Sequence, residues 1–105
     1  MTSNAIVEAR ILLDGVKVAT TGAPTSQIRA KKTFEADISG VGAVSATVVF
    51  EGSNAGRHWE ALGSLDLSGT GSASGALFHD GPWAAVRATV TAISAGSTLT
   101  AAMGF

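Results

Sequence analysis

Residues 28–38, IRAKKTFEADI, alternate apolar and polar side chains and decide the fold class. The even positions are apolar except for Lys32, and the odd positions are polar or charged. Successive side chains of a strand point to opposite faces of a sheet, so this spacing predicts a strand with one buried and one solvated face. Residues 44–50 repeat the alternation after Gly40-Val41-Gly42, which predicts a turn and a hairpin partner for the first strand.

The same period of two continues toward the end of the chain, and no window keeps the apolar spacing of a helix. Gly63 lies within one alternating stretch and suggests a β-bulge. Residues 68–75 are small and polar, which predicts an exposed, mobile loop. The further strands that we expect cover residues 59–67, 76–79, 83–93 and 98–103, with the last two forming a terminal hairpin. The fold class is therefore all-β.

Residues 1–27 show no single face that would be buried in a core, because residues 4–13 carry apolar side chains at both odd and even positions. Asp14-Gly15 is a preferred type I′ turn pair and predicts a hairpin between residues 11–13 and 16–18. Pro24 lies in a linker or surface loop over residues 20–27. The segment is either an arm that packs on a neighbouring subunit or an edge hairpin of its own domain. Residues 28–105 form the β-sandwich of that single domain.

Composition limits the partners of this chain of 105 residues. With 13 Gly and 19 Ala but only four Phe and two Trp, the core is thin, so we expect a homo-oligomer, a dimer or trimer. The net charge of −1 argues against nucleic acid as a partner. The chain has no cysteine. We expect no signal peptide, because the N-terminus has no basic region and Glu8 interrupts its apolar run. We also expect no membrane contact, because no apolar run approaches the length of a membrane span.

The second half resembles a module of small tailed-bacteriophage structural proteins. The resemblance rests on the turn Gly52-Ser53-Asn54-Ala55-Gly56, on Trp59, and on Trp83 preceding a strand with the sequence VRATVT at residues 86–91. It implies an antiparallel β-sandwich, jelly-roll-like, with about seven to eight strands. It also implies a virion protein located on the capsid surface and made in the host bacterial cytoplasm. Ala55 stands where the family usually has Asp, which argues against a ligand or metal role for this turn.

The sequence predicts no catalytic, metal or cofactor site. His58 and His79 lack a nucleophile motif and a third strong metal ligand nearby. Residues 69–75 are rich in glycine but lack the Gly-Lys-Ser/Thr ending and the following helix of a phosphate loop. The basic residues Arg29, Lys31 and Lys32 are typical of a solvated strand face.

A contact with a protein partner is the predicted role of the remaining candidate residues. Core filling is expected of Trp59, while Trp83 suits core and contact equally. Arg87 alternates with apolar neighbours and is expected to face outward, where Arg is common at interfaces. The candidate contact residues are Ile6, Val7, Ile11, Leu12, Arg57, His58, Trp83 and Arg87.

The leading hypothesis is a non-enzymatic capsid decoration or cement protein that binds the major capsid protein or another virion protein and stabilises the head shell. A head-fibre or tail attachment protein of the virion fits nearly as well. The alternative from another class is a carbohydrate-binding, discoidin-like module, for which Arg57, His58, His79 and Trp83 would be the candidate residues.

Overall fold

The computed structural model describes residues 9–26 and 30–105, and these form an all-β, antiparallel structure without a helix. No helix in this part of the chain is therefore long and apolar enough to span a membrane. The strands are β1 (Ala9–Val16), β2 (Thr20–Thr21), β3 (Thr25–Ser26), β4 (Lys31–Ser53), β5 (Glu60–Asp80), β6 (Ala85–Ile93) and β7 (Thr98–Gly104). The predicted fold class is confirmed.

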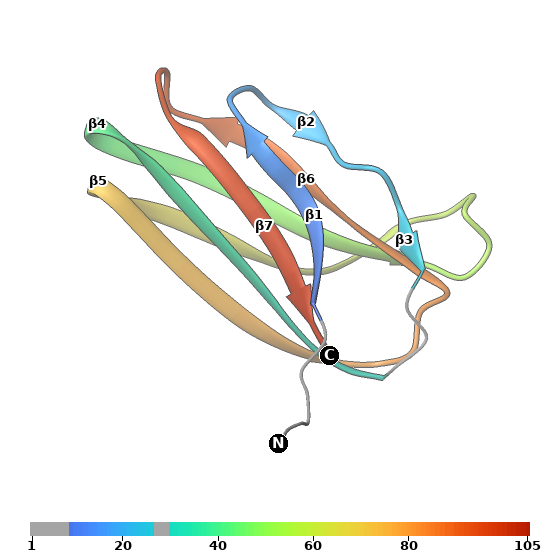
Figure 1. The fold of residues 1–105 in the computed structure, drawn as a ribbon. Helices are drawn as coiled ribbons and strands as arrows, with labels where there is room; N and C mark the ends of the chain where they lie inside the picture. Colours follow the sequence, from blue (N-terminus) through green and yellow to red (C-terminus); the bar gives the residue numbers. More distant parts are fainter. Residues whose placement is uncertain (1–8, 27–29) are drawn as a thin grey trace.

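Two long bent strands, β4 and β5, create the two layers of the sandwich (Figure 1). Residues 31–39 of β4 pair with residues 72–80 of β5, and residues 43–52 of β4 pair with residues 60–70 of β5. Both strands turn back at glycines with positive φ, Gly42 at 76° and Gly71 at 79°, a conformation that costs glycine little. The first half of β4 also pairs with β7, and the second half pairs with β6. One layer therefore contains β1, β7 and one half each of β4 and β5, and the other contains the remaining halves with β6, β2 and β3.

The hairpins predicted from the alternation are wrong. The two halves of β4 lie in opposite layers, and the rings of Phe34 and Phe50 stack across the core with centroids 4.6 Å apart. Likewise β6 pairs with β4, β2 and β3, while β7 pairs with β1 and β4, so these two strands form no terminal hairpin. Alternation fixes which face of a strand is buried, but it does not specify which strand lies alongside.

The hairpin predicted at Asp14-Gly15 is also wrong, because β1 runs as one strand along β7. Register shifts on either side of Leu13 place Leu12 and Leu13, which are adjacent in sequence, both in the core. Gly15 has φ at +61°, and its N–H donates to Thr100 Oγ1 at 3.2 Å. These irregularities explain why this stretch is apolar at both parities. Residues 1–8 lie outside the described residues.

Residues 68–75 form strand rather than the predicted loop. Ser72 and Ser74 face outward, while Ala73 and Gly75 face the other half of β5. A Cβ at Gly75 would lie 3.2 Å from Leu67 Cδ2, so the small residue accommodates a leucine from the opposite layer. Small side chains here indicate close packing of the two halves of β5.

The predicted bulge near Gly63 is present, since Phe50 pairs with Gly63 and Glu51 with Ala61, leaving Leu62 unpaired.

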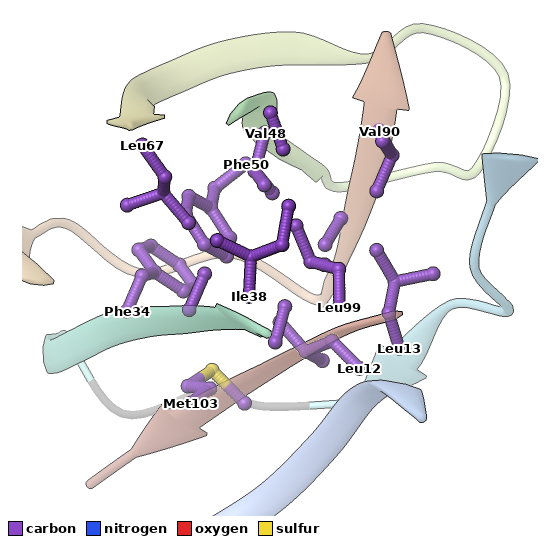
Figure 2. Packing of buried hydrophobic residues seen from close by; sticks show 14 of the residues in the cluster. Leu12, Leu13, Phe34, Ile38, Val48, Phe50, Leu67, Val90, Leu99 and Met103 are labelled. Atoms are coloured by element: carbon purple, nitrogen blue, oxygen red, sulfur yellow. The ribbon is translucent and has the colours of Figure 1, made fainter. Parts of the chain in front are cut away.

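The core lies between the two layers and is built largely from single residues at alternate positions (Figure 2). Its larger members are Leu12, Leu13, Phe34, Ile38, Val48, Phe50, Leu67, Val90, Leu99 and Met103. The expectation that Lys32 belongs to a solvated strand face is wrong, because its side chain is only 1% exposed and lies on the inward side of β4. Its ammonium donates to Gly81 O at 2.7 Å and to Ala30 O at 3.1 Å. Burial lowers the pKa of Lys32, and nearby Asp80 partly opposes this shift.

Candidate interaction surface

The loop of residues 54–59, between β4 and β5, is held by its own polar side chains. Ser53 Oγ accepts a hydrogen bond from the Gly56 N–H at 2.8 Å, and Asn54 Oδ1 accepts one from the Ala84 N–H at 3.0 Å. Gly56 has φ at +74°, which glycine adopts without strain. The residues of the Gly-Ser-Asn-Ala-Gly turn therefore have structural roles. The loop is preorganised and leaves Arg57 and His58 exposed.

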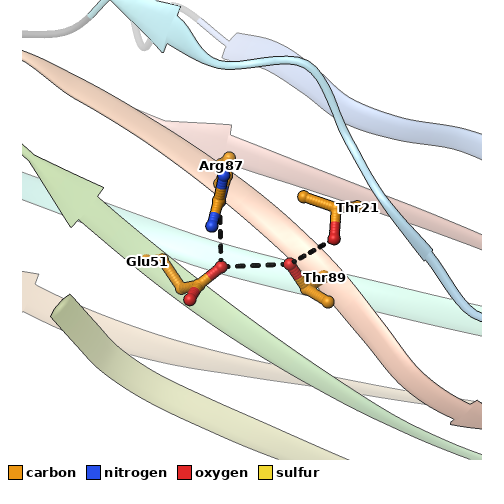
Figure 3. Close-up of polar contacts among 4 residues, drawn as sticks. All are labelled: Thr21, Glu51, Arg87 and Thr89. Carbon is orange, nitrogen blue, oxygen red and sulfur yellow. Dashed lines mark hydrogen bonds and ion pairs between the residues drawn. The ribbon is translucent and has the colours of Figure 1, made fainter. Parts of the chain in front are cut away.

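Arg87 lies on the outer face of β6 and bonds to Glu51 of β4 (Figure 3). Its Nε donates to Glu51 Oε1 at 3.0 Å, and its guanidinium lies 4.1 Å from the centroid of the Trp59 ring. Thr89 Oγ1 donates to the same Glu51 oxygen at 3.0 Å and lies 3.2 Å from Thr21 Oγ1. Arg87 and Glu51 are mostly buried, with side-chain exposures of 25% and 20%. Arg87 faces outward as predicted, and it holds Trp59 by a cation–π contact.

The expectation that Trp59 fills the core is wrong. The bulge at Leu62 reverses the alternation at the start of β5, so Leu62 packs against the core while Ala61 is exposed. Trp59 is two residues before Ala61 and therefore lies on the same outer face, where it is half-buried under Arg87. Trp59 and Glu51 are thus members of this surface that sequence reasoning missed. The bulge signal at Gly63 could have identified the reversal.

Trp83 lies on the inner side of the same end of the sandwich. Its ring packs against the core and over Gly52, where an added Cβ would lie 2.6 Å from Trp83 Cδ2. Its Nε1–H donates to His79 Nε2 at 3.0 Å. Trp83 stays half-exposed and, with Asn54, Pro82 and Ala84, lines a shallow depression of about 270 Å³. Trp83 therefore combines core packing with an accessible edge.

Burial, and to a lesser extent the charge of Lys32, lower the pKa of His79, while Asp80 opposes the shift. Accepting a bond from Trp83 also requires His79 Nε2 to be unprotonated. Below the ordinary pKa of about 6.5, the unfolded chain binds more protons at this position than the folded chain does. Stability contributed by neutral His79 is therefore present above that pKa and is lost as the pH falls.

We expect the free energy of unfolding, measured by urea denaturation, to be lower at pH 5 than at pH 7. His79→Gln is expected to reduce this difference, because an amide oxygen can accept the Trp83 bond without titrating. The matched control is His58→Gln, since His58 is exposed and paired with Glu60 at 2.6 Å. A pH difference that is unchanged in His79→Gln would contradict the assignment.

The predicted contact residues do not form one surface in the structure. Arg57, His58 and Arg87 lie at the loop end of the second layer, and Trp83 lies on its inner side. Ile11 is 57% exposed on β1, in the first layer, whereas Leu12 is 5% exposed and packs in the core. Ile6 and Val7 lie outside the described residues. Across residues 9–26 and 30–105, no group of three or more acidic or histidine side chains is placed to hold a metal ion.

Fold and surface together define an antiparallel β-sandwich that presents a preorganised loop at one end. No protein-family model and no curated protein matches the sequence. Among solved structures, the crystal structure of the SPBc2 prophage-derived protein YomS is similar, with a TM-score of 0.60 and 13% sequence identity. The match covers 98% of this chain and 98% of that chain. The two proteins therefore share the fold over nearly the full extent of each chain.

Proposed function

We propose that this chain is a non-enzymatic structural protein of a phage virion. The observation that carries the proposal is the full-length similarity of fold to a prophage-derived protein of nearly matching extent. The Gly-Ser-Asn-Ala-Gly turn and the two tryptophans, on which the resemblance to phage structural proteins rests, lie at one end of the sandwich, where Trp83 packs over Gly52 at the start of the turn. We further propose a position on the capsid surface, where the chain acts as a decoration or cement protein and stabilises the head shell by binding the major capsid protein.

The loop of residues 54–59 supplies the contact surface in this proposal. Within the described residues Arg57 makes no hydrogen bond or ion pair, and it stands on a backbone already fixed by Ser53 and Asn54. A preordered loop loses little conformational entropy on binding, and an exposed Arg is a residue type enriched at energetically dominant interface positions. His58, exposed beside Arg57, completes the accessible pair.

Glycan binding receives less support from this surface. Sugar rings pack on exposed aromatic faces, but the Arg87 guanidinium lies over the Trp59 ring, and the Trp83 ring packs over Gly52. The contact surface therefore offers charged and backbone groups more than open aromatic faces. This composition fits a protein partner better than a carbohydrate.

Cosedimentation with undecorated heads of the encoding phage tests the proposal. We expect the wild-type chain to bind at saturable stoichiometry, and Arg57→Ala/His58→Ala to weaken binding about tenfold or more, which is about 1.4 kcal/mol. Lys17→Ala removes a comparable exposed charge from another loop and serves as the control with unchanged affinity. A wild-type chain that stays in the supernatant would reject the decoration role. Equal binding by all variants would reject the loop as the contact.

A further inference from the structure

The outer edge of β5 has no partner within the described part of the chain. Over its 21 residues β5 pairs with β4 alone, and it is the edge strand of both layers because both strands bend together (Figure 1). Along an edge strand, backbone N–H and C=O groups that point away from the sheet stay available to another strand. One side of the sandwich therefore carries two free edges supplied by a single strand.

The other edges of the sandwich are interrupted, which is the usual protection against strand pairing. In the second layer the opposite edge consists of β2 and β3, of two residues each, with Pro24 between them. In the first layer β1 contains two register shifts. By contrast β5 contains no Pro, Lys or Arg. Among the described strands it forms the longest edge and carries none of these residues, although it has a bulge at Leu62 and bends at Gly71.

The core is also incompletely covered along β5. Its inward-facing Leu65, Ala73 and Leu77 are only partly buried, whereas Phe34 and Val86 of the interior strands are fully buried. Phe78, on the outer face of β5, is 63% exposed. A partner along this edge would thus cover apolar side chains as well as pair the backbone.

We propose that two copies of this chain pair antiparallel through β5 about a two-fold axis. A Cβ at Gly75 would lie 3.5 Å from Leu65 Cδ2, so these residues face each other from the two halves of the strand. If the two-fold axis passes beside Gly75 and Leu65, each half of β5 lies antiparallel to the same half of β5 in the second copy. Such an isologous contact closes on itself and extends both layers at once. The inference stands on the fold and does not depend on the proposed function.

Charge and side-chain size favour a second copy as the occupant. In this register Asp66 lies opposite Ser64, while Glu60 and Asp80 lie at the ends of the two halves of β5, and no two acidic residues face each other. The central part of the pairing also brings apolar side chains together. Leu77 lies opposite Ala73, and Leu65 lies opposite its own counterpart. The strand is therefore self-complementary, since directly opposed like charges would destabilise a cross-strand pair.

Sedimentation equilibrium of the full chain tests the pairing. We expect twice the mass of the 10.5 kDa chain for the wild type. Ser74→Lys/Ala76→Lys is expected to yield the monomer mass with an unchanged circular dichroism spectrum, because both side chains face outward and would gather four like charges beside the axis. Ala9→Lys/Ile11→Lys places the same charges on the other edge of that layer and should remain dimeric. A wild-type monomer, a trimer, or a dimer disrupted only by the β1 variant would overturn the proposal.

Cysteine pairing tests the register, because the chain has no cysteine of its own. In Ser74→Cys/Ala76→Cys the axis at Gly75 places each new thiol opposite the other thiol of the second copy. Directly opposed residues of antiparallel strands have Cα separations of about 4.5–5.5 Å, within the range of a disulfide. We expect a covalent dimer on mild oxidation, and none for Ala9→Cys/Ile11→Cys. A dimer by mass that forms no disulfide in the β5 variant would overturn this axis, and a covalent dimer from the β1 variant alone would move the interface to β1.

Discussion

Replacing Phe50 with alanine is expected to lower the free energy of unfolding by about 3–5 kcal/mol, the largest effect of any prediction here. Phe50 is fully buried, and its ring stacks on Phe34 across the two layers. Apart from Phe34, the remaining core is built largely of small and medium side chains on two layers joined by continuous strands, so it cannot collapse readily into the space left by the ring. Loss of this size is a large part of the stability of a typical small domain.

Urea denaturation of Phe50→Ala measures the loss. Val49→Ala is the matched control, because Val49 is adjacent on β4 but lies half-buried on the outer side of the strand. We expect the control to lose much less stability than Phe50→Ala. Similar losses for the two variants would contradict the assignment of the buried face of β4.

Replacing Gly52 with alanine is expected to cost about 1–3 kcal/mol through overpacking. The added Cβ would lie 2.6 Å from Trp83 Cδ2 and 2.7 Å from Trp83 Cγ. Because the indole ring is rigid, these two atoms cannot move away from the Cβ independently of the rest of the ring. The ring must shift as a whole, which disturbs its hydrogen bond to His79. The variant is therefore expected to change tryptophan fluorescence as well as stability.

Gly63→Ala provides the control for Gly52→Ala. The atoms nearest to a Cβ at Gly63 would be the two methyl carbons of Leu77, at 3.1 and 3.2 Å, and a flexible leucine can give way by a few tenths of an ångström. We expect a smaller loss of stability and little change in fluorescence. A greater loss in Gly63→Ala than in Gly52→Ala would contradict the packing of Trp83 described here.

Period-two alternation predicted the buried face of β4 correctly on both sides of its bend, at the even positions of residues 34–38 and of residues 44–50. Lys32 appeared to break that pattern, but its ammonium is satisfied by two carbonyl groups at a layer crossing, a tertiary arrangement that the local sequence does not reveal. Strand pairing was not predictable for a related reason. Bending of long strands at Gly42 and Gly71 places neighbouring sequence segments in opposite layers.

The candidate surface was predictable in part. The outward direction of Arg87 followed from alternation, and the loop followed from its turn residues. The position of Trp59 depended on a bulge that reverses the parity of the residues before it, which Gly63 signals but which alternation alone does not reveal. For residues 68–75, small polar composition is shared by exposed loops and by strands that pack against leucines, so composition alone misassigned them.

The proposal that this chain is part of a phage virion is tested most directly by the protein content of purified particles. Particles released by a phage whose genome encodes the chain would be banded on a density gradient and their proteins quantified by mass spectrometry. We predict that the chain co-bands with intact particles in a fixed ratio to the major capsid protein. Finding the chain in the lysate but not in the banded particles would contradict the claim.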